Sequence, residues 1–238
     1  MFLYIIRHGK PDYATDTLLE EGWAQARLVA KRLATGGIDE IHASPMGRAR
    51  QTAQPLAEAL NLPVEVEDWA YELGEEAKTT WLDGRPKQMV HVPAAYLRAG
   101  AYMRMTSEEA MREVDCFQQG SGFMKRYHQL SNGLDGMLER LGYRRTETGV
   151  YRPVSPNGKH VALFCHAGML RPLLSHALNI PVHLLVSTIF VQFTGITILH
   201  FPREGAEDFS PALIALGDTG HLYASGHTQN HYFFHEDY

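Results

Sequence analysis

The chain has little of three features that would each place it in a particular class of protein. Its two cysteines, Cys116 and Cys165, stand far apart in the sequence, so the pattern favours reduced thiols in the cytoplasm over a disulfide framework. No apolar run approaches the roughly 18 residues that span a bilayer. The apolar start at Met1 also lacks the basic stretch of a secretory signal. We therefore expect neither secretion nor a membrane partner.

The chain also has fewer positively than negatively charged residues. The sequence holds 22 Lys and Arg against 27 Asp and Glu, a formal net charge of -5, which argues against a nucleic-acid partner but leaves room for a local basic pocket. There is no internal repeat or long linker. With 238 residues, of which 45% are hydrophobic and 21% charged, the chain is long enough for one large α/β domain that carries an insertion.

The first residues carry the clearest chemical pattern. Residues 3–6 form an apolar run that predicts a buried strand, and Arg7, His8 and Gly9 follow it directly. In an open α/β sheet, ligands bind at the carboxyl ends of the strands. A neutral imidazole is a nucleophile and an arginine fork matches phosphoryl oxygens, so this pair suits phosphate chemistry. The alternative is a surface arginine beside a helix-capping histidine.

Spacing and periodicity predict the other elements of the fold. Thr17 and Glu20 have the spacing of a capping box, which would start a helix that stops at Gly36. Ser44 can open a second helix with Arg48 in its first turn, near an N-terminus that favours anions. Further expected elements are strands at 38–43, 63–67, 160–165, 189–193, 197–201 and 212–216, a hairpin at 143–154 and a helix at 169–178.

The middle of the chain differs in character from both ends. Residues 85–141 are helix-prone but interrupted by glycine, proline and polar residues, including Pro93, Gly100 and the pair Asn132 and Gly133. This pattern predicts an inserted cap of several short helices at about residues 73–156. The predicted strand at 160–165 then ends like the first one, in a histidine followed closely by a glycine.

Several motifs occur in the order and spacing of one known family. The resemblance is to the histidine phosphatase superfamily, the phosphoglycerate mutase-like proteins. It is carried by Arg7-His8-Gly9, by Ser44-Pro45-x-x-Arg48-Ala49-x-Gln51-Thr52-Ala53, by a strand followed by His166-x-Gly168, and by Asp218-Thr219-Gly220-His221-Leu222 near the C-terminus. The resemblance covers roughly residues 1–72 and 158–222 and leaves the cap unmatched.

The resemblance implies a three-layer α/β sandwich, with a mostly parallel sheet between helices on both faces, and a phosphate pocket. By position, His8 matches the nucleophile that becomes phosphohistidine. Arg7 and Arg48 match the phosphate clamps, and His166 matches the second pocket histidine. Two arginines can balance the charge of a phosphoryl group in transfer, so we expect neither a metal nor a cofactor.

Neighbours of these residues are expected to contact the substrate. They are Gly9, Lys10 and Ala167, with a solvent-facing role as the alternative for Lys10. The leaving alcohol needs a proton, and family members usually supply it from a carboxylic acid in the loop after the third strand or directly after the second histidine. Because Ala167 occupies the second position here, we expect Glu72 to be the general acid, with Glu75, Glu76 and Asp83 as alternatives.

The first motif departs from the pattern of the mutases in this family. Mutases usually continue the motif as His-Gly-Glu-Thr with an asparagine shortly after, whereas this chain has Lys10, Pro11 and Ala14 at those positions. We therefore expect a phosphatase that hydrolyses a small-molecule phosphomonoester. Phosphoglycerate mutase-type transfer and a silent phospho-ligand or protein-binding module are the alternatives, and association into a homo-oligomer stays open.

Three histidines near the C-terminus form a separate pattern. His227, His231 and His235 have a spacing that would place them on one helical face. Such a face could bind a metal ion. The interpretation we favour is an aromatic tail that packs on the body of the protein or on a neighbouring subunit.

Overall fold

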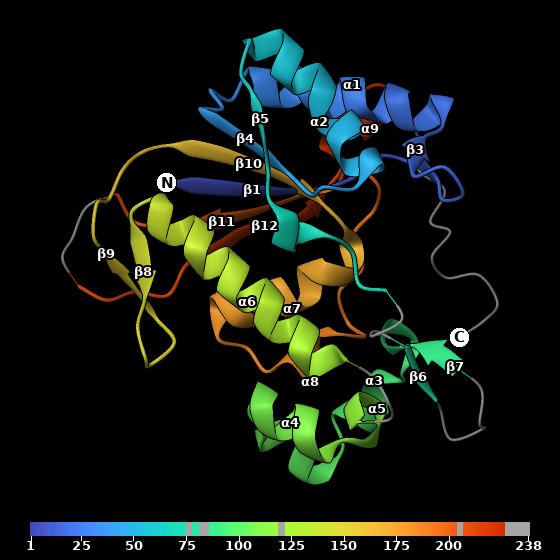
Figure 1. The fold of residues 1–238 in the computed structure, drawn as a ribbon, viewed down its shortest axis with the longest axis vertical. Helices are drawn as coiled ribbons and strands as arrows, with labels where there is room; N and C mark the ends of the chain where they lie inside the picture. Colours follow the sequence, from blue (N-terminus) through green and yellow to red (C-terminus); the bar gives the residue numbers. More distant parts are fainter. Residues whose placement is uncertain (75–77, 81–85, 119–121, 204–206, 227–238) are drawn as a thin grey trace.

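The computed structural model describes residues 1–74, 78–80, 86–118, 122–203 and 207–226. Its centre is a six-stranded sheet with the order β12-β11-β1-β10-β4-β5 (Figure 1). The strands are β1 (Phe2–Arg7), β4 (Glu40–Ala43), β5 (Val64–Val66), β10 (His160–Cys165), β11 (Ile196–His200) and β12 (Ala212–Asp218). β1, β10, β4 and β5 run parallel, while β11 is antiparallel to both of its neighbours.

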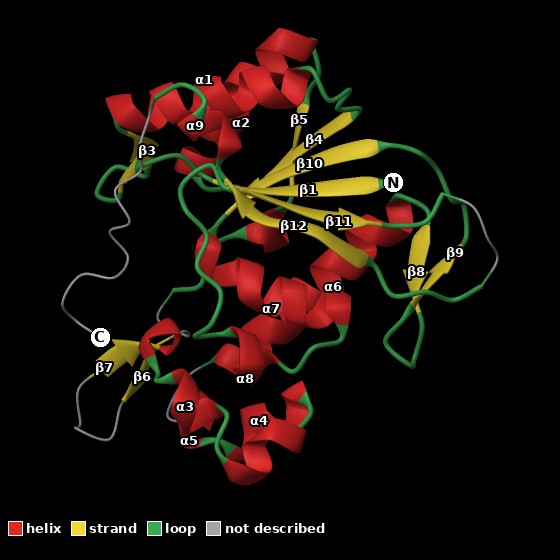
Figure 2. Ribbon diagram, turned by 180° about the vertical axis from the view of Figure 1, so that it is seen from behind, coloured by secondary structure: helices red, strands yellow, loops and turns green. Residues whose placement is uncertain are grey.

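Helices cover both faces of this sheet (Figure 2). α1 (Glu20–Ala34), α2 (Gly47–Leu60) and α9 (Gly220–Tyr223) lie on one side, and α6 (Phe123–Arg140) and α7 (Ala167–Leu178) lie on the other. Because successive side chains of a strand point to opposite faces, Leu3 and Ile5 join the core against α6 and α7, whereas Ile6 joins the core against α1 and α2. The expected three-layer α/β arrangement is confirmed.

Residues 73–156, where the cap is predicted, contain short helices, two hairpins and the 18-residue helix α6, which packs against the sheet. Their elements are β6 (Lys78–Thr80), β7 (Pro86–Gln88), η3 (Met89–His91), α3 (Ala94–Leu97), η4 (Gly100–Arg104), α4 (Ser107–Glu113), α5 (Asp115–Gln118), α6, β8 (Tyr143–Arg145) and β9 (Tyr151–Pro153). The short helices gather beyond α8 (Val182–Leu185), away from the sheet (Figure 1). They pack around a separate apolar cluster that includes Met111, Phe117 and Val182.

The predicted break at Asn132 and Gly133 is wrong, because α6 runs through both residues. A Cβ on Gly133 would lie 2.2 Å from Cγ of Trp69. This glycine therefore allows the helix to approach the Trp69 ring closely and does not end it. α6 also places Leu130, Leu134 and other residues in the core against the sheet.

Two other local predictions are wrong. Thr17 does not cap a helix, because its backbone pairs with Asp12 in the small ladder of β2 (Pro11–Asp12) and β3 (Thr17–Leu18), and α1 begins after Leu19 without a side-chain cap. Residues 189–193 form a loop and not a strand. The predicted hairpin is confirmed as β8 and β9, with Gly149 at a φ of 85° in the turn.

Over the described part of the chain, no helix combines the length and the hydrophobicity that crossing a membrane requires. Cys116 and Cys165 are both free and buried.

Candidate active site

The site forms where two neighbouring parallel strands end. In the pairing of β1 with β10, Arg7 lies opposite Cys165. His8 and His166, which directly follow the two strands, therefore lie at the same edge of the sheet. Their ring centroids are 5.2 Å apart, and both side chains are buried. The two histidine motifs therefore meet in space because of strand register, although they lie far apart in the sequence.

His8 is held in one tautomer by its own loop. Its Nδ1 lies 2.7 Å from the carbonyl oxygen of Gly9, and because a carbonyl can only accept, Nδ1 donates and carries the proton. Nε2 is then left with a lone pair. Burial, together with the positive charges of Arg7 and Arg48, lowers the pKa of His8 to about 3, which keeps the imidazole neutral at physiological pH. This is the form that a nucleophile requires.

His166 is oriented by a serine from the second motif. Its Nε2 lies 2.7 Å from Oγ of Ser44, and this hydroxyl also accepts a bond from the backbone N-H of Met46. If the Ser44 hydroxyl donates to Nε2, the proton of the imidazole resides on Nδ1, a buried atom that has no hydrogen-bond partner. Burial is the main cause that lowers the pKa of His166 well below its usual value.

Arg7 and Arg48 bring two buried guanidinium groups to the histidines. Nη1 of Arg7 donates to the carbonyl oxygen of Val191 over 2.7 Å, and its Cζ lies 4.0 Å from the centre of the Phe193 ring. Arg48 forms an ion pair with Asp16, whose other oxygen accepts from the backbone N-H of Gly47 over 2.6 Å. Fixed cations of this kind can hold phosphoryl oxygens without reorganising during a reaction.

Glu72 enters the site from the loop that follows β5 and lies at the N-terminus of α7. Its carboxylate accepts backbone N-H bonds from Gly168, Met169 and Leu73 at 2.8–2.9 Å. A Cβ on Gly168 would lie 2.4 Å from Oε1 of Glu72. The glycine of the His166-x-Gly168 motif is therefore needed because a side chain there would displace the carboxylate.

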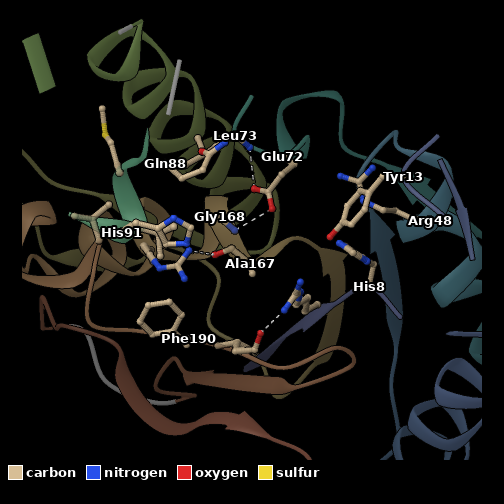
Figure 3. Close-up of a pocket in the computed structure, with 16 residues that line it drawn as sticks. His8, Tyr13, Arg48, Glu72, Leu73, Gln88, His91, Ala167, Gly168 and Phe190 are labelled. Atoms are coloured by element: carbon tan, nitrogen blue, oxygen red, sulfur yellow. Dashed lines mark hydrogen bonds between the residues drawn. The ribbon is translucent and has the colours of Figure 1, made fainter. Parts of the chain in front are cut away.

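These residues surround a cavity of about 330 Å³ (Figure 3). Its described lining residues are Arg7, His8, Tyr13, Arg48, Glu72, Leu73, Gln88, Met89, Val90, His91, Ala167, Gly168, Arg171, Val186, Phe190 and Val191. In Figure 3, His8, Arg48 and Tyr13 stand at one end and His91 and Phe190 at the other, with Glu72 and Gly168 between them.

Some of the site residues predicted from the sequence line the cavity, and others do not. Arg7, His8, Arg48, Glu72 and Ala167 line the cavity, and His166 lies against His8. Gly9 and Lys10 are not among the lining residues. The amide of Gly9 donates to Oγ1 of Thr52 over 2.9 Å, and Lys10 forms an exposed ion pair with Glu21 at 2.6 Å. Glu75, Glu76, Asp83, His227, His231 and His235 lie outside the described residues.

Several residues of this site were not predicted from the sequence. Tyr13 lies beside His8 and Arg48, with its ring centroid 6.5 Å from that of His8 and 5.5 Å from Cζ of Arg48. Phe190 lies at the opposite end of the cavity (Figure 3), and Arg171 lies beside it, with Cζ 5.2 Å from the centre of the Phe190 ring. The sequence offers one signal for Arg171: it follows Gly168 by three residues, a spacing that places both on the same side of a helix. Tyr13 and Phe190 lie in loops whose positions depend on distant contacts.

Among the described residues, no three or more His, Cys, Asp or Glu side chains gather in a group that could hold a metal ion. The polar groups that converge beside His8 are two guanidinium groups, a second imidazole and a carboxylate. This donor set suits an anionic ligand with several oxygens better than a metal cation.

Comparisons with known proteins agree with the motifs. Residues 3–115 match the model of the histidine phosphatase superfamily (branch 1). A probable phosphoglycerate mutase GpmB from Serratia proteamaculans is 37% identical over 71 residues, which are 26% of this chain and 33% of that relative's length. The same-named protein from Yersinia pestis is 26% identical over 197 residues, 76% of each chain. The first of these relatives is thus matched over about a third of its length.

Solved structures share the fold at low sequence identity. Phosphoserine phosphatase from Entamoeba histolytica, solved with 3-phosphoglyceric acid, has a TM-score of 0.58 and 21% identity, with 93% of this chain and 98% of that chain covered. The alpha-ribazole phosphatase from Shigella flexneri also has a TM-score of 0.58, at 16% identity over 92% of this chain and 96% of that chain. The match to the family model thus covers slightly less than half of the chain, whereas the likeness in fold to these solved structures extends over more than nine-tenths of it.

Proposed function

We propose that this protein is a metal-independent phosphatase that hydrolyses a small phosphomonoester through a covalent phosphohistidine at His8. The observation that carries the proposal is the state of His8: a buried, neutral imidazole whose Nδ1 donates to Gly9 and whose Nε2 faces a pocket with two arginines. Such an imidazole presents the lone pair of Nε2 to the pocket. It is suited to attack an electrophilic phosphorus atom.

In the proposed reaction, Nε2 of His8 attacks phosphorus in line and the ester P-O bond breaks. Arg7, Arg48 and Nδ1-H of His166 hold the phosphoryl oxygens, on which negative charge develops. Glu72, in its protonated form, passes its proton to the leaving alcohol oxygen. Glu72 then takes a proton from a water molecule that attacks phosphorus, which breaks the P-N bond and releases inorganic phosphate.

The names of the curated relatives favour phosphoglycerate mutase-type transfer as the second candidate. A mutase must hold a bisphosphorylated intermediate while it turns, and this requires cations for a second phosphate. Lys10, at the position where the first motif departs from the mutases, pairs with Glu21. Arg171 also lines the pocket, but its Nε and Nη1 donate to the backbone carbonyl oxygens of Ile189 and Ala167. Hydrolysis needs only that water reaches the phosphohistidine, so these contacts support the phosphatase better. Dependence of activity on a bisphosphoglycerate would favour the mutase.

We further propose that residues 73–156 act as the cap of a single domain and select the leaving group. The contribution of Leu73, Gln88, Met89, Val90 and His91 to the pocket supports this. The two free, buried cysteines support a cytoplasmic location. The expected partner is a small phosphomonoester.

The test is hydrolysis of p-nitrophenyl phosphate by the wild type, His8→Ala and His128→Ala at pH 5 to 8, with EDTA present. His128 lies outside this pocket, against Glu108, and serves as the matched control. We expect full activity of the wild type and the control in EDTA, and at least about a thousandfold loss in His8→Ala. Acid-labile phosphate on the protein should appear only when His8 is present. Equal activity of His8→Ala would overturn the proposed route.

A further inference from the structure

The pocket is larger than a phosphate group requires, and its two ends differ in chemistry. His8, Arg7 and Arg48 form the end that suits phosphate. The far end, which we call the leaving-group end, is lined largely by apolar side chains. The apolar lining residues include Leu73, Met89, Val186 and Phe190. Val191 lies where the two ends meet, because its carbonyl oxygen accepts from Arg7. In Figure 3, Phe190 and His91 lie at this end of the pocket, opposite His8 and Arg48.

Much of the apolar lining is fixed by the cores on either side. Met89 and Val186 belong to the cluster of the short helices, and Val191 belongs to the core against the sheet. All three are almost fully buried. Phe190 is only partly buried and lines the cavity. The leaving-group end is therefore a preformed apolar surface with one accessible aromatic ring.

Arg171 holds this ring in place. Its Nε donates to the carbonyl oxygen of Ile189 over 2.6 Å, and its Nη1 donates to that of Ala167 over 2.9 Å. Its Cζ lies 5.2 Å from the centre of the Phe190 ring. One buried guanidinium thus joins the loop that carries Phe190 to the first turn of α7. Such a clamp fixes the distance between Phe190 and the phosphate end.

We infer that the leaving-group end binds an aromatic or similarly bulky apolar alcohol, with Phe190 as the residue that determines specificity and Arg171 as a positioning residue. The inference rests on the proposed function, because it takes the end at His8 as the phosphate site. Glu72 is the one carboxylate among the described lining residues, and Arg171 is a cation. This charge pattern disfavours alcohols that carry an ammonium group. An apolar ring on Phe190 is favoured by burial and by ring packing.

The test measures binding of non-hydrolysable phosphonates, so that the reactivity of a leaving group plays no part. Methylphosphonate occupies the phosphate end alone, whereas benzylphosphonate adds one ring for the leaving-group end. Titration calorimetry on the full chain should give about tenfold tighter binding of benzylphosphonate, because a phenyl ring is transferred from water. The ratio of the two dissociation constants is the readout.

Three variants assign that ratio to named residues. Phe190→Ala and Arg171→Lys should reduce the preference for benzylphosphonate to below about threefold while methylphosphonate still binds, which also shows that the variants are folded. Tyr223→Ala removes a highly exposed ring outside the lining residues and should keep the full preference. Lysine retains the charge of Arg171 but not its fork, so a loss of preference in this variant reports positioning.

The outcomes separate this inference from the proposed function. Equal binding of the two phosphonates by the wild type, no binding of either, or an unchanged preference in Phe190→Ala would overturn the inference, whether or not p-nitrophenyl phosphate is hydrolysed. A preference that depends on Phe190 in a protein that forms no phosphohistidine would uphold the aromatic site and overturn only the hydrolysis.

Discussion

At the scale of single residues, one neighbour places the proton on each histidine of the site. The carbonyl of Gly9 holds the proton of His8 on Nδ1, and the Ser44 hydroxyl can leave the proton of His166 on Nδ1 as well. One imidazole then presents a lone pair and the other presents a donor, although both side chains are buried and neutral. The same residue type therefore serves as nucleophile and as phosphate ligand in the proposed mechanism.

Glu72→Gln tests the proposed general acid. The amide keeps the shape of the side chain but has no acidic proton to transfer, so hydrolysis should slow most when the leaving group is poor. We expect kcat/KM for phenyl phosphate to fall by about a hundredfold or more, and that for p-nitrophenyl phosphate by less than about tenfold. Both substrates carry one aromatic ring, so the comparison isolates leaving-group basicity.

The exposed Glu139, which pairs with Arg144, offers Glu139→Gln as a control that should leave both rates unchanged. In Glu72→Gln, the new side-chain amide would also face backbone N-H groups that now donate to the carboxylate. A general loss from this misfit would reduce both substrates equally, and that result would contradict the role of Glu72 as the acid.

At the scale of elements, α6 shows how packing overrides a local breaking signal. Gly133 and Gly136 both lie inside this helix, and glycine is a poor helix former compared with alanine. Their surroundings differ, however. A Cβ at Gly133 would collide with the Trp69 ring at 2.2 Å, whereas a Cβ at Gly136 would meet only Nη1 of Arg140, at 4.0 Å.

The matched pair Gly133→Ala and Gly136→Ala should therefore have opposite effects on stability. Gly136→Ala should raise the free energy of unfolding by about 0.5–1 kcal/mol through helix propensity. Gly133→Ala should lower it by about 1–3 kcal/mol, because the helix or Trp69 must move. Urea unfolding of both variants measures the difference. Equal stabilisation by both substitutions would mean that the contact with Trp69 imposes no constraint.

At the scale of the whole molecule, the fold keeps several histidines neutral in its interior. Burial is the main cause that lowers the pKa of His8 to about 3, of His221 to about 4, and of His166 well below its usual value. In the unfolded chain these groups take up protons near pH 6.5. Between about pH 6.5 and pH 4 the unfolded state therefore binds more protons than the native state, and acid favours unfolding.

The free energy of unfolding should consequently be highest near neutral pH and should fall as the pH is lowered from 7 to 4, by up to about 1.4 kcal/mol per pH unit for each such histidine. His221→Gln tests one contribution away from the lining of the pocket, because glutamine can still bond to Thr194, the present partner of His221. Its stability should depend less steeply on pH than that of the wild type. A profile that rises toward acid would contradict the assignment of neutral buried histidines.

Much of the architecture was determined by local sequence. Apolar runs specified β1 and β10, the polar motifs marked where these strands end, and Arg48 fell in the first turn of α2 as its spacing indicated. These predictions succeeded because strand burial and family motifs depend on residues close together in the chain, whereas the exact starts of α1 and α2 did not follow the expected capping residues Thr17 and Ser44. The motif residues Gln51 and Thr52 also proved to serve position, since each accepts a backbone N-H from the segment that follows β1.

Only the tertiary structure decided how the far end of the pocket is built. Residues 189–193 are apolar enough to suggest a strand, yet the carbonyl of Val191 accepts from the side chain of Arg7, and that of Ile189 accepts from Arg171. An apolar run does not encode whether its carbonyl groups will bond to another strand or to a distant guanidinium. That choice depends on contacts between residues up to 184 positions apart, which form only when the sheet, α7 and this loop have come together.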